Sequence, residues 1–401
     1  MSTISQENRE LLAESDALQD ATVKLRRHLH AIPELGLELP QTQEAVLDAI
    51  DGLGLTIRTG TTSTSVVAVL EGDEPGPTML LRGDMDALPM PEDTGLDFAS
   101  RTDGMMHACG HDMHTAMLAG AARLLAARRG TLKGRVVFMF QPGEEGYAGA
   151  EHMLNEGLLE GVGDVTGAFA LHVTTFAPSG LVTLKGGSLM ASSDVLRIRI
   201  TGAGGHASAP HLAIDPIPIA CEIVQAFQMM ITRRVDAFDP AVVTVSQIMA
   251  GTMNNVIPEY ADIVGTIRTV SEKNREMVHA RLQKLAEGIA AAHDAIAVVD
   301  IERVYPVTIN DATFAQKVTS IASDLLGSHR VHPMTNPVMG SEDFSFVLQR
   351  VPGAMAFLGA TPSGVDPRTA APNHSNRAVF DEATMSTGIG LYAAMALNHL
   401  R

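Results

Sequence analysis

The sequence is poor in cysteine, in aromatic residues and in long apolar runs. Only two cysteines, Cys109 and Cys221, occur in 401 residues, whereas a secreted disulfide scaffold carries more, so we expect a reducing, cytoplasmic environment. Tryptophan is absent and aromatic residues make up 4% of the chain. No uninterrupted apolar run is long enough to cross a bilayer. The polar segment 1–10 lacks the apolar stretch of a signal peptide, so we expect no membrane association.

Positive charge is also scarce. The chain has 29 Lys and Arg against 46 Asp and Glu, which gives a formal net charge of −17. This excess disfavours nucleic acid and anionic membranes as partners, because phosphate binding depends on Lys and Arg. Hydrophobic residues make up 45% and charged residues 19%, which is typical of a globular protein. The length predicts one very large domain or two ordinary ones.

Helical and strand-like segments alternate in the first part of the chain. This alternation predicts an α/β fold with a mostly parallel central sheet flanked by helices. A further helix is expected at the end of the chain, over 382–400. The other expected helices cover about 14–31, 111–129 and 148–159, and the expected strands cover 65–70, 78–82, 135–141 and 168–172.

The middle of the chain follows a different order, βαββαβ, which is the split pattern of a ferredoxin-like sandwich. We therefore expect residues 1–186 to form the first part of a catalytic domain, 187–304 an inserted ferredoxin-like domain, and 305–401 the second part of the catalytic domain. The segments behind this prediction are strands 195–201, 242–249, 262–269 and 296–305, with helices 214–233 and 271–292.

Five short segments with metal-binding side chains lie at or just after expected strand ends. In open α/β sheets such ends form a common crevice, and thiolate, imidazole and carboxylate are ligands of zinc and related divalent ions. The sequence therefore predicts a metal site there. The segments are Asp84-Met85-Asp86, Cys109-Gly110-His111-Asp112, Glu144-Glu145, His172 and His374.

Single residues leave alternatives open. A lone Cys109 is also compatible with a small buried hydrophobic residue. His107 and His114 lie four residues before and three residues after His111, and helical periodicity does not choose among the three as ligands. The Glu144-Glu145 pair follows an apolar strand, where two carboxylates repel each other unless cations are near. One glutamate can then bind metal while the other acts as a general base.

Longer motifs resemble a known family. The sequence is similar to the amidohydrolase branch of the aminoacylase and carboxypeptidase metallopeptidases, which includes hippurate hydrolases, N-acyl-amino-acid amidohydrolases and plant auxin-conjugate hydrolases. The similarity covers nearly the whole chain in order. The motifs that carry it are Arg82–Pro89, Met106–Asp112, Gln141–Gly146, Leu171-His172, Gly204–His211, Asn255–Pro258, Gly265–Arg268, Gly340–Phe344 and Asn373–Ser375.

The resemblance implies a dinuclear metal centre and a two-domain fold whose ferredoxin-like domain acts as a lid and forms a homodimer. Two divalent ions per subunit, zinc, manganese, cobalt or nickel, would activate a water that cleaves the amide bond of a small N-acyl amino acid. It implies Glu144 as general base and acid, His206 as oxyanion stabiliser, and Arg268 and Asn255 as substrate-anchoring residues. The implied metal ligands are Cys109, His111, Glu145, His172 and His374.

Two positions near the metals differ from many relatives. Those relatives carry His-x-Asp where this chain has Asp84-Met85-Asp86. We expect Asp86 to orient a metal ligand. The sequence leaves three roles open for Asp84: metal ligand, support for a ligand, or no role in the site. Cys109 stands where other relatives bridge the metals with a carboxylate, so bridging by its sulfur is a hypothesis.

Three other functions compete with this interpretation. A dipeptidase or carboxypeptidase of the same family differs only in the acyl side of the substrate. A metal-binding protein without catalysis would need no general base, so the presence of Glu144 argues against it. A serine or cysteine hydrolase is disfavoured because the chain has no Gly-x-Ser-x-Gly motif, so Cys109 would have to be the nucleophile.

Overall fold

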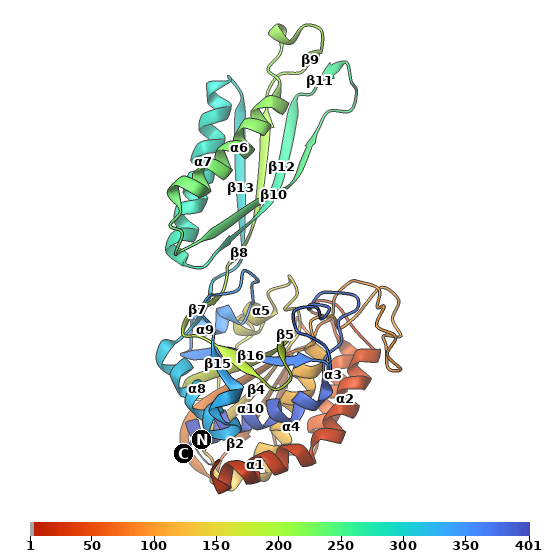
Figure 1. Ribbon diagram of the computed structural model, residues 1–401, viewed down its shortest axis with the longest axis vertical. Coiled ribbons are helices and arrows are strands. Elements are labelled where there is room, and N and C mark those ends of the chain that lie inside the picture. Colours follow the sequence, from red (N-terminus) through yellow and green to blue (C-terminus); the bar gives the residue numbers. More distant parts are fainter. Residues whose placement is uncertain (1–3) are drawn as a thin grey trace. The chain divides into compact units, whose positions relative to one another are not determined.

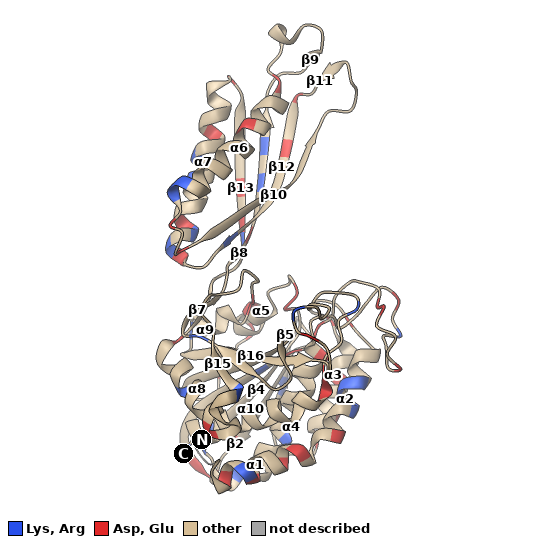
Figure 2. Ribbon diagram, in the orientation of Figure 1, with Lys and Arg blue, Asp and Glu red and all other residues tan. Residues whose placement is uncertain are grey.

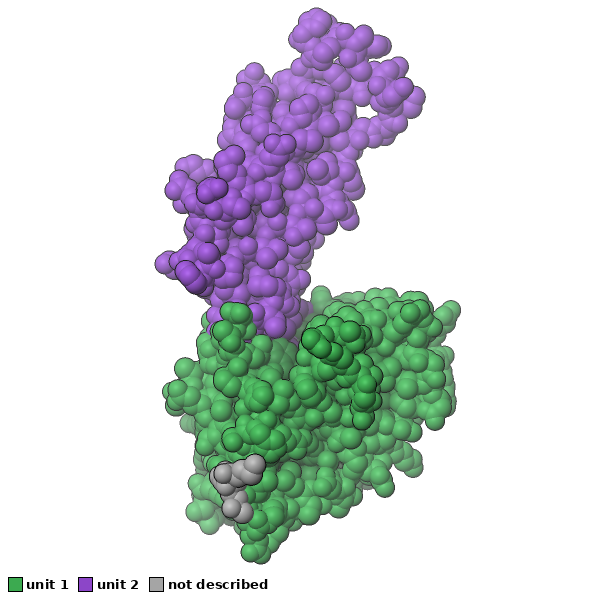
Figure 3. All heavy atoms as spheres, in the orientation of Figure 1, with its two compact units in different colours: residues 1–187, 309–336, 346–401 green, residues 188–308, 337–345 purple. Residues whose placement is uncertain are grey.

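The computed structural model describes residues 4–401 and is drawn in Figure 1. The chain divides into two compact units, coloured green and purple in Figure 3. The first unit runs to Gly187 and includes Ile309–Asn336 and Phe346–Arg401. The second unit comprises Ser188–Thr308 and Pro337–Ser345. Each unit has its own buried apolar core.

An eight-stranded sheet forms the centre of the first unit. The strand order is β1-β2-β4-β3-β5-β16-β6-β15, and the four central strands β4, β3, β5 and β16 run parallel. The central strands read as continuous apolar runs because helices cover both faces of such sheets. The strands are β1 Thr56–Thr59, β2 Val66–Glu71, β3 Glu74–Asp84, β4 Lys133–Gln141, β5 Val165–Pro178, β6 Val182–Leu184, β15 Val331–Pro333 and β16 Gly353–Thr361. The predicted α/β fold with a mostly parallel sheet is confirmed.

Helix α4, His111–Ala127, is the central helix of this unit. It packs against β3, α2 and α10, and fourteen of its seventeen residues are buried, as expected for a helix that is apolar or small on all sides. The other helices are α1 Gln6–Ala17, α2 Gln19–Ala31, α3 Pro40–Ile50, α5 Gly149–Asn155, α8 Ala312–Leu326, α9 Ser345–Leu348 and α10 Met385–His399, with short 3₁₀ turns at Arg129–Thr131, Ser328–Arg330 and Glu382–Thr384. One more 3₁₀ turn, Pro210–Leu212, belongs to the second unit.

The N-terminal helices differ from the sequence-based expectation. The single helix predicted over 14–31 is two helices, α1 and α2, which meet at Leu18, where the Leu18 N–H turns back to the Ser15 carbonyl at 3.1 Å. Helix α3 is absent from the prediction. It begins at Pro40, a residue that breaks a helix interior but is well tolerated in the first turn.

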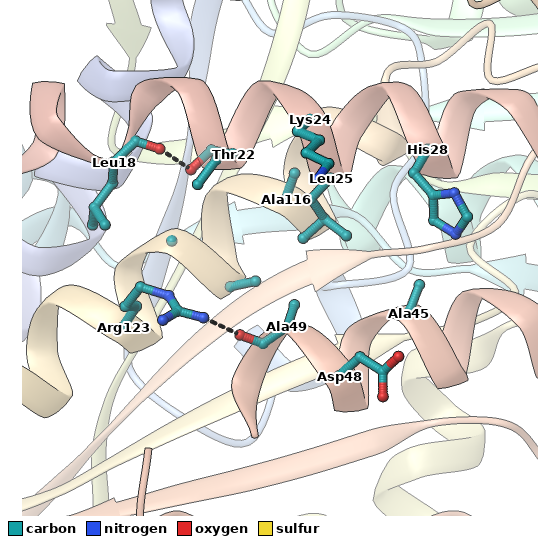
Figure 4. A pocket seen from close by; sticks show the side chains of 13 residues that line it. Leu18, Thr22, Lys24, Leu25, His28, Ala45, Asp48, Ala49, Ala116 and Arg123 are labelled. Atoms are coloured by element: carbon teal, nitrogen blue, oxygen red, sulfur yellow. Dashed lines mark hydrogen bonds between the residues drawn. The ribbon is translucent and has the colours of Figure 1, made fainter. Parts of the chain in front are cut away.

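A groove of about 450 Å³ lies between α2, α3 and α4. Figure 4 shows its polar side chains, among them Lys24, His28, Asp48 and Arg123, around a floor of small residues. Arg123 donates a hydrogen bond to the Ala49 carbonyl at 2.9 Å. None of the predicted metal ligands lines this groove.

The second unit is a four-stranded antiparallel sheet with two helices. Its strand order, β10-β12-β8-β13, and its chain order βαββαβ are those of a ferredoxin-like sandwich. Buried side chains alternate with exposed ones along β8, so one sheet face packs against the helices. The elements are β8 Ser193–Thr201, α6 Pro216–Arg234, β10 Ala241–Ala250, β12 Tyr260–Thr269, α7 Glu272–Ala292 and β13 Ile296–Tyr305.

Four short strands complete the described chain. They are β7 Gly187–Met190, β9 Gly205–His206, β11 Val256–Ile257 and β14 Thr308–Asn310, and β9 pairs with β11. Within residues 4–401, no helix combines the length and the apolar character needed to cross a bilayer.

Candidate metal centre

The candidate site lies at the carboxyl ends of the central strands of the first unit. Asp84 is the last residue of β3 and is paired with Gln141, the last residue of β4. The Glu144-Glu145 pair follows β4 directly, and His172 lies in the neighbouring strand β5. Since these strands run parallel, their ends meet at one edge of the sheet.

The other four side chains predicted as ligands come together around Cys109. Its sulfur lies 3.4 Å from Nε2 of His172 and 3.2 Å from Nε2 of His374. Glu145 Oε1 lies 3.1 Å from the same His374 nitrogen and 3.9 Å from Nε2 of His111. Two overlapping groups, each with ligand atoms within 4.8 Å of one another, share Cys109: one with His111 and His172, the other with Glu145 and His374.

Backbone contacts fix which ring nitrogen faces the cluster. Nδ1 of His111 lies 2.9 Å from the Asp86 carbonyl, and Nδ1 of His172 lies 2.8 Å from the Val173 carbonyl. A carbonyl only accepts, so both Nδ1 atoms carry a proton, and Nε2 is the nitrogen that each ring turns toward the cluster. Burial lowers the pKa of His111, but Asp84 and Cys109 outweigh it and hold that pKa well above its usual range, so without an ion Nε2 carries a proton as well. Within residues 4–401, this buried nitrogen has no hydrogen-bond partner and lies beside a thiol and carboxylates, where a divalent cation would replace the proton.

The Asp86 carboxylate supports the glutamate pair. Its Oδ1 accepts the backbone N–H of Glu144 at 3.0 Å, and its Oδ2 accepts that of Glu145 at 2.9 Å. Oδ1 also lies 3.4 Å from Nδ1 of His111. One buried carboxylate thus holds the backbone of two predicted site residues and lies beside a third.

Asp84 and His114 form a buried hydrogen bond with each other. Nδ1 of His114 donates to Asp84 Oδ1 at 2.6 Å, and Nε2 of His114 accepts the N–H of Val173 at 2.7 Å. Both ring nitrogens of His114 are therefore engaged, which leaves no lone pair for a metal. The other Asp84 oxygen lies 2.8 Å from Arg82 Nη1 and 3.4 Å from Nε2 of His111. This geometry favours Asp84 as support for the site.

His107 is buried, and neither of its ring nitrogens has a hydrogen-bond partner within the described chain. Burial lowers the pKa of His107 to about 3, so its ring is neutral. It belongs to none of the clustered donor groups formed by the described residues. Of the three histidines near the start of α4, only His111 shares a donor group of the described residues with Cys109 or with Glu145.

Without a bound ion, the acidic and basic groups of the cluster share protons. Hydrogen bonds to Cys109 and Glu145 raise the pKa of His374 to about 10. Burial, together with the Glu145 carboxylate, raises the pKa of the Cys109 thiol. Burial also lowers the pKa of His172 well below its usual range. A divalent ion would reverse the effect on the thiol, because a coordinating cation stabilises the thiolate.

Two residues outside the predicted set hold the cluster in place. Gly110 lies between Cys109 and His111 with φ +89°, and a Cβ there would lie 2.4 Å from Val173 Cγ2. Asn373 donates from its side-chain amide to the carbonyls of Cys109 and Val173 at 3.1 and 3.0 Å. His374 itself has φ +67°. The sequence signals for Asn373 were its position next to His374 and its place in the motif Asn373–Ser375.

The other predicted site residues lie in the second unit. Nδ1 of the exposed His206 accepts the N–H of Ser208 at 3.1 Å. Asn255 accepts a backbone hydrogen bond from Ala207 at 3.1 Å, so it lies beside the short pair β9 and β11. Arg268 in β12 is half-buried and donates to Ser341 Oγ at 2.8 Å, and burial lowers its pKa. The roles of these residues stay predictions.

Comparison with known proteins agrees with this geometry. The thermostable carboxypeptidase 1 of Saccharolobus solfataricus is 36% identical over 95% of both chains. The N-acetylcysteine deacetylase of Bacillus subtilis is 39% identical over 86% of this chain and 89% of that protein. The crystal structure of the Bacillus subtilis YXEP protein, described as a dinuclear metal binding peptidase, has a TM-score of 0.82 and 35% identity over 96% of this chain and 99% of the other.

A family model matches residues 80–398, which include every clustered donor residue described above. The chain belongs to peptidase family M20/M25/M40.

Proposed function

We propose that this protein is a metal-dependent amidohydrolase that cleaves N-acyl amino acids to a carboxylic acid and a free amino acid. The observation that carries the proposal is the convergence of the donor atoms of Cys109, His111, Glu145, His172 and His374 in two overlapping groups that share Cys109. The family is one of amide hydrolases, and the relative from Bacillus subtilis named for N-acetylcysteine deacetylation supports an N-acyl amino acid as substrate.

Cys109, His111, Glu145, His172 and His374 would hold two divalent ions, of zinc, manganese, cobalt or nickel. The donor set of sulfur, nitrogen and oxygen atoms suits any of these metals, and Cys109 belongs to both overlapping groups, so its sulfur would contribute to holding either ion. When bound, such ions polarise the amide carbonyl and lower the pKa of a nearby water. A thiol ligand must stay reduced, so we propose the cytoplasm as the compartment.

Glu144 is the proposed general base and acid. Its side chain is buried, with 6% exposed, and its backbone is fixed by Asp86 at 3.0 Å. The carboxylate would take a proton from the attacking water and deliver it to the leaving nitrogen, a contribution of about 10²–10⁴ in rate. Both glutamates belong to a donor group with His111, but only Glu145 also belongs to a group with Cys109, the one that includes His374.

The second unit would complete the site. We propose that His206 stabilises the tetrahedral oxyanion, where one good donor contributes roughly 3–4 kcal/mol. Arg268 would pair with the α-carboxylate of the substrate and Asn255 would help to anchor it. The Arg268 guanidinium would offset the repulsion between an anionic substrate and a chain of net charge −17. We also propose a homodimer formed through the ferredoxin-like unit.

Two matched variants test the division of roles between the glutamates. The Glu144→Gln variant should keep its full metal content and lose at least about 10²-fold in kcat. The Glu145→Gln variant should lose bound metal. Metal content is measured by mass spectrometry after gel filtration, and activity on a panel of N-acyl amino acids. Near-normal turnover by Glu144→Gln would remove that residue from the mechanism.

The similarity to a thermostable carboxypeptidase favours a second candidate, cleavage of peptides from their carboxyl end. The same substrate panel decides between the two when it includes matched dipeptides and N-acetyl amino acids. Higher kcat/KM for dipeptides would support the carboxypeptidase. No hydrolysis of any amide by the metal-loaded protein would instead support a binding protein without catalysis.

A further inference from the structure

A second candidate binding site lies on the outer face of the two helices of the second unit. Four cationic side chains line one groove there: Arg233 and Arg234 at the end of α6, and Arg281 and Lys284 on α7. Figure 2 shows Lys and Arg residues on these two helices. No Asp or Glu lines the groove. Within residues 4–401, none of the four cations forms an ion pair.

The floor of the groove is apolar. Met229 and Met230 of α6 and Leu285 and Ile289 of α7 line it, and its volume is about 470 Å³. This volume lies within the usual range of small-molecule sites. Met229 is 65% exposed, and methionine side chains adapt readily to apolar ligands.

Gly288 keeps the groove open on the side of α7. It lines the groove, and a Cβ built on it meets no atom within 4 Å. Glycine inside a helix is less favourable than alanine, so α7 carries a helix-weakening residue at a position where a side chain would enter the groove.

We propose that this groove binds a small amphipathic carboxylate, with an anionic head held by the cations and an apolar chain on the methionine, leucine and isoleucine side chains. Arginine binds carboxylates through paired hydrogen bonds. The carbonyl end of α6 offsets part of the charge of Arg233 and Arg234, whereas Arg281 and Lys284 have no such compensation. The proposal does not depend on the metal centre or on turnover.

The absence of tryptophan provides a direct reporter. In the full-length Glu144→Gln protein, Met229→Trp places a single indole at the groove, and octanoate should change its emission in a saturable way. Octanoate represents a free fatty acid and N-octanoylglycine an N-acyl amino acid, which carry the same combination of carboxylate and apolar chain. The compound that binds more tightly identifies which of the two classes the groove prefers. Octanol should bind at least about tenfold more weakly, because it lacks the charge. A Val298→Trp reporter on β13, where Val298 is 63% exposed, should not respond.

Two further substitutions test the shape and the charge of the groove. In the Met229→Trp background, Gly288→Leu fills the groove without changing charge, and Arg281→Glu reverses one charge. Each should weaken octanoate binding at least about tenfold. Lys273→Glu, on the same helix but outside the groove, should leave binding unchanged. Circular dichroism confirms that each variant is folded.

Several results would overturn the proposal. They are equal binding of octanol and octanoate, or full binding by both the Gly288→Leu and the Arg281→Glu variants. Binding only to phosphatidylglycerol vesicles, with none to monomeric octanoate, would identify a membrane contact instead. Dissociation of an oligomer by Arg281→Glu without loss of octanoate binding would assign the groove to a second copy of the chain.

Discussion

Asp86 is the residue whose replacement tests the architecture of the site most directly. Its two carboxylate oxygens accept the backbone N–H groups of Glu144 and Glu145 at 3.0 and 2.9 Å. Its carbonyl accepts a hydrogen bond from Nδ1 of His111 at 2.9 Å. The Asp86→Asn variant keeps the shape of the side chain, but one carboxylate oxygen is replaced by an NH₂ group. This donor then faces one of the two backbone N–H donors, so one of the two hydrogen bonds is lost.

The cost follows from the lost hydrogen bond. A hydrogen bond to a charged acceptor contributes about 1.5–3 kcal/mol, and a buried N–H without a partner costs a further amount of about 1–3 kcal/mol. Side chains that orient metal ligands typically change metal affinity or activity about 10–100-fold when replaced. We therefore expect Asp86→Asn to weaken metal binding and to lower kcat/KM by about 10–100-fold, because the turn that carries both glutamates shifts.

The measurement is a competition titration with a chromophoric chelator, combined with steady-state kinetics at saturating metal. Asp215→Asn is the matched control, since Asp215 also accepts a backbone N–H, that of Ile217 at 3.0 Å, but at the start of α6 in the second unit. It should leave metal affinity unchanged. If Asp86→Asn bound metal as tightly as the wild type and kept its kcat/KM, the proposed positioning role would be wrong.

Two further predictions concern stability. Burial raises the pKa of Glu156, but hydrogen bonds from residues 61–62 outweigh it and lower the pKa from 4.5 to about 2. The stabilisation by the ionised Glu156 is thus present above pH 4.5 and is lost as the pH falls toward 2. Glu156→Gln should therefore lower the free energy of unfolding by about 1 kcal/mol at pH 7, after allowance for solvent screening, and by less at pH 3. Urea titrations at the two pH values measure the difference. Gly110→Ala should lower the melting temperature and weaken metal binding, because its Cβ would lie 2.4 Å from Val173 Cγ2. Gly52→Ala is the control, because Gly52 also has a positive φ, +70°, but a Cβ there meets no atom within 4 Å. It measures the cost of the backbone conformation alone. Equal losses of melting temperature and of metal binding in the two variants would exclude the steric explanation.

The positions of the candidate donors near strand ends could be predicted because the signals are local. The apolar run of β4 ends at Gln141 and is followed by a Pro-Gly turn before the glutamate pair. Parallel strands then bring this turn to the same sheet edge as Asp84 at the end of β3. The amide-hydrolase class follows from the motifs and is confirmed by the family match.

Other features depend on contacts that no local pattern contains. The break between α1 and α2 at Leu18 occurs without glycine or proline at that position. No helix-breaking residue therefore marked the break within the helix predicted over 14–31. That prediction also began too late, because α1 starts at Gln6. Helix α3, which the prediction lacks, begins at Pro40, in a first-turn position where proline fits.

The two histidines of α4 show why ligand assignment needs tertiary structure. His111 and His114 are three residues apart, both are fully buried, and their rings are 5.4 Å apart. The partners that distinguish them are Asp84 at the end of β3 and Val173 within β5, 30 and 59 residues away from His114. Those partners engage both nitrogens of His114, whereas the Asp86 carbonyl engages only Nδ1 of His111 and leaves Nε2 facing the cluster. Helical spacing therefore predicts which histidines reach the site, but only the hydrogen bonds made by distant strands determine which nitrogen can bind a metal ion.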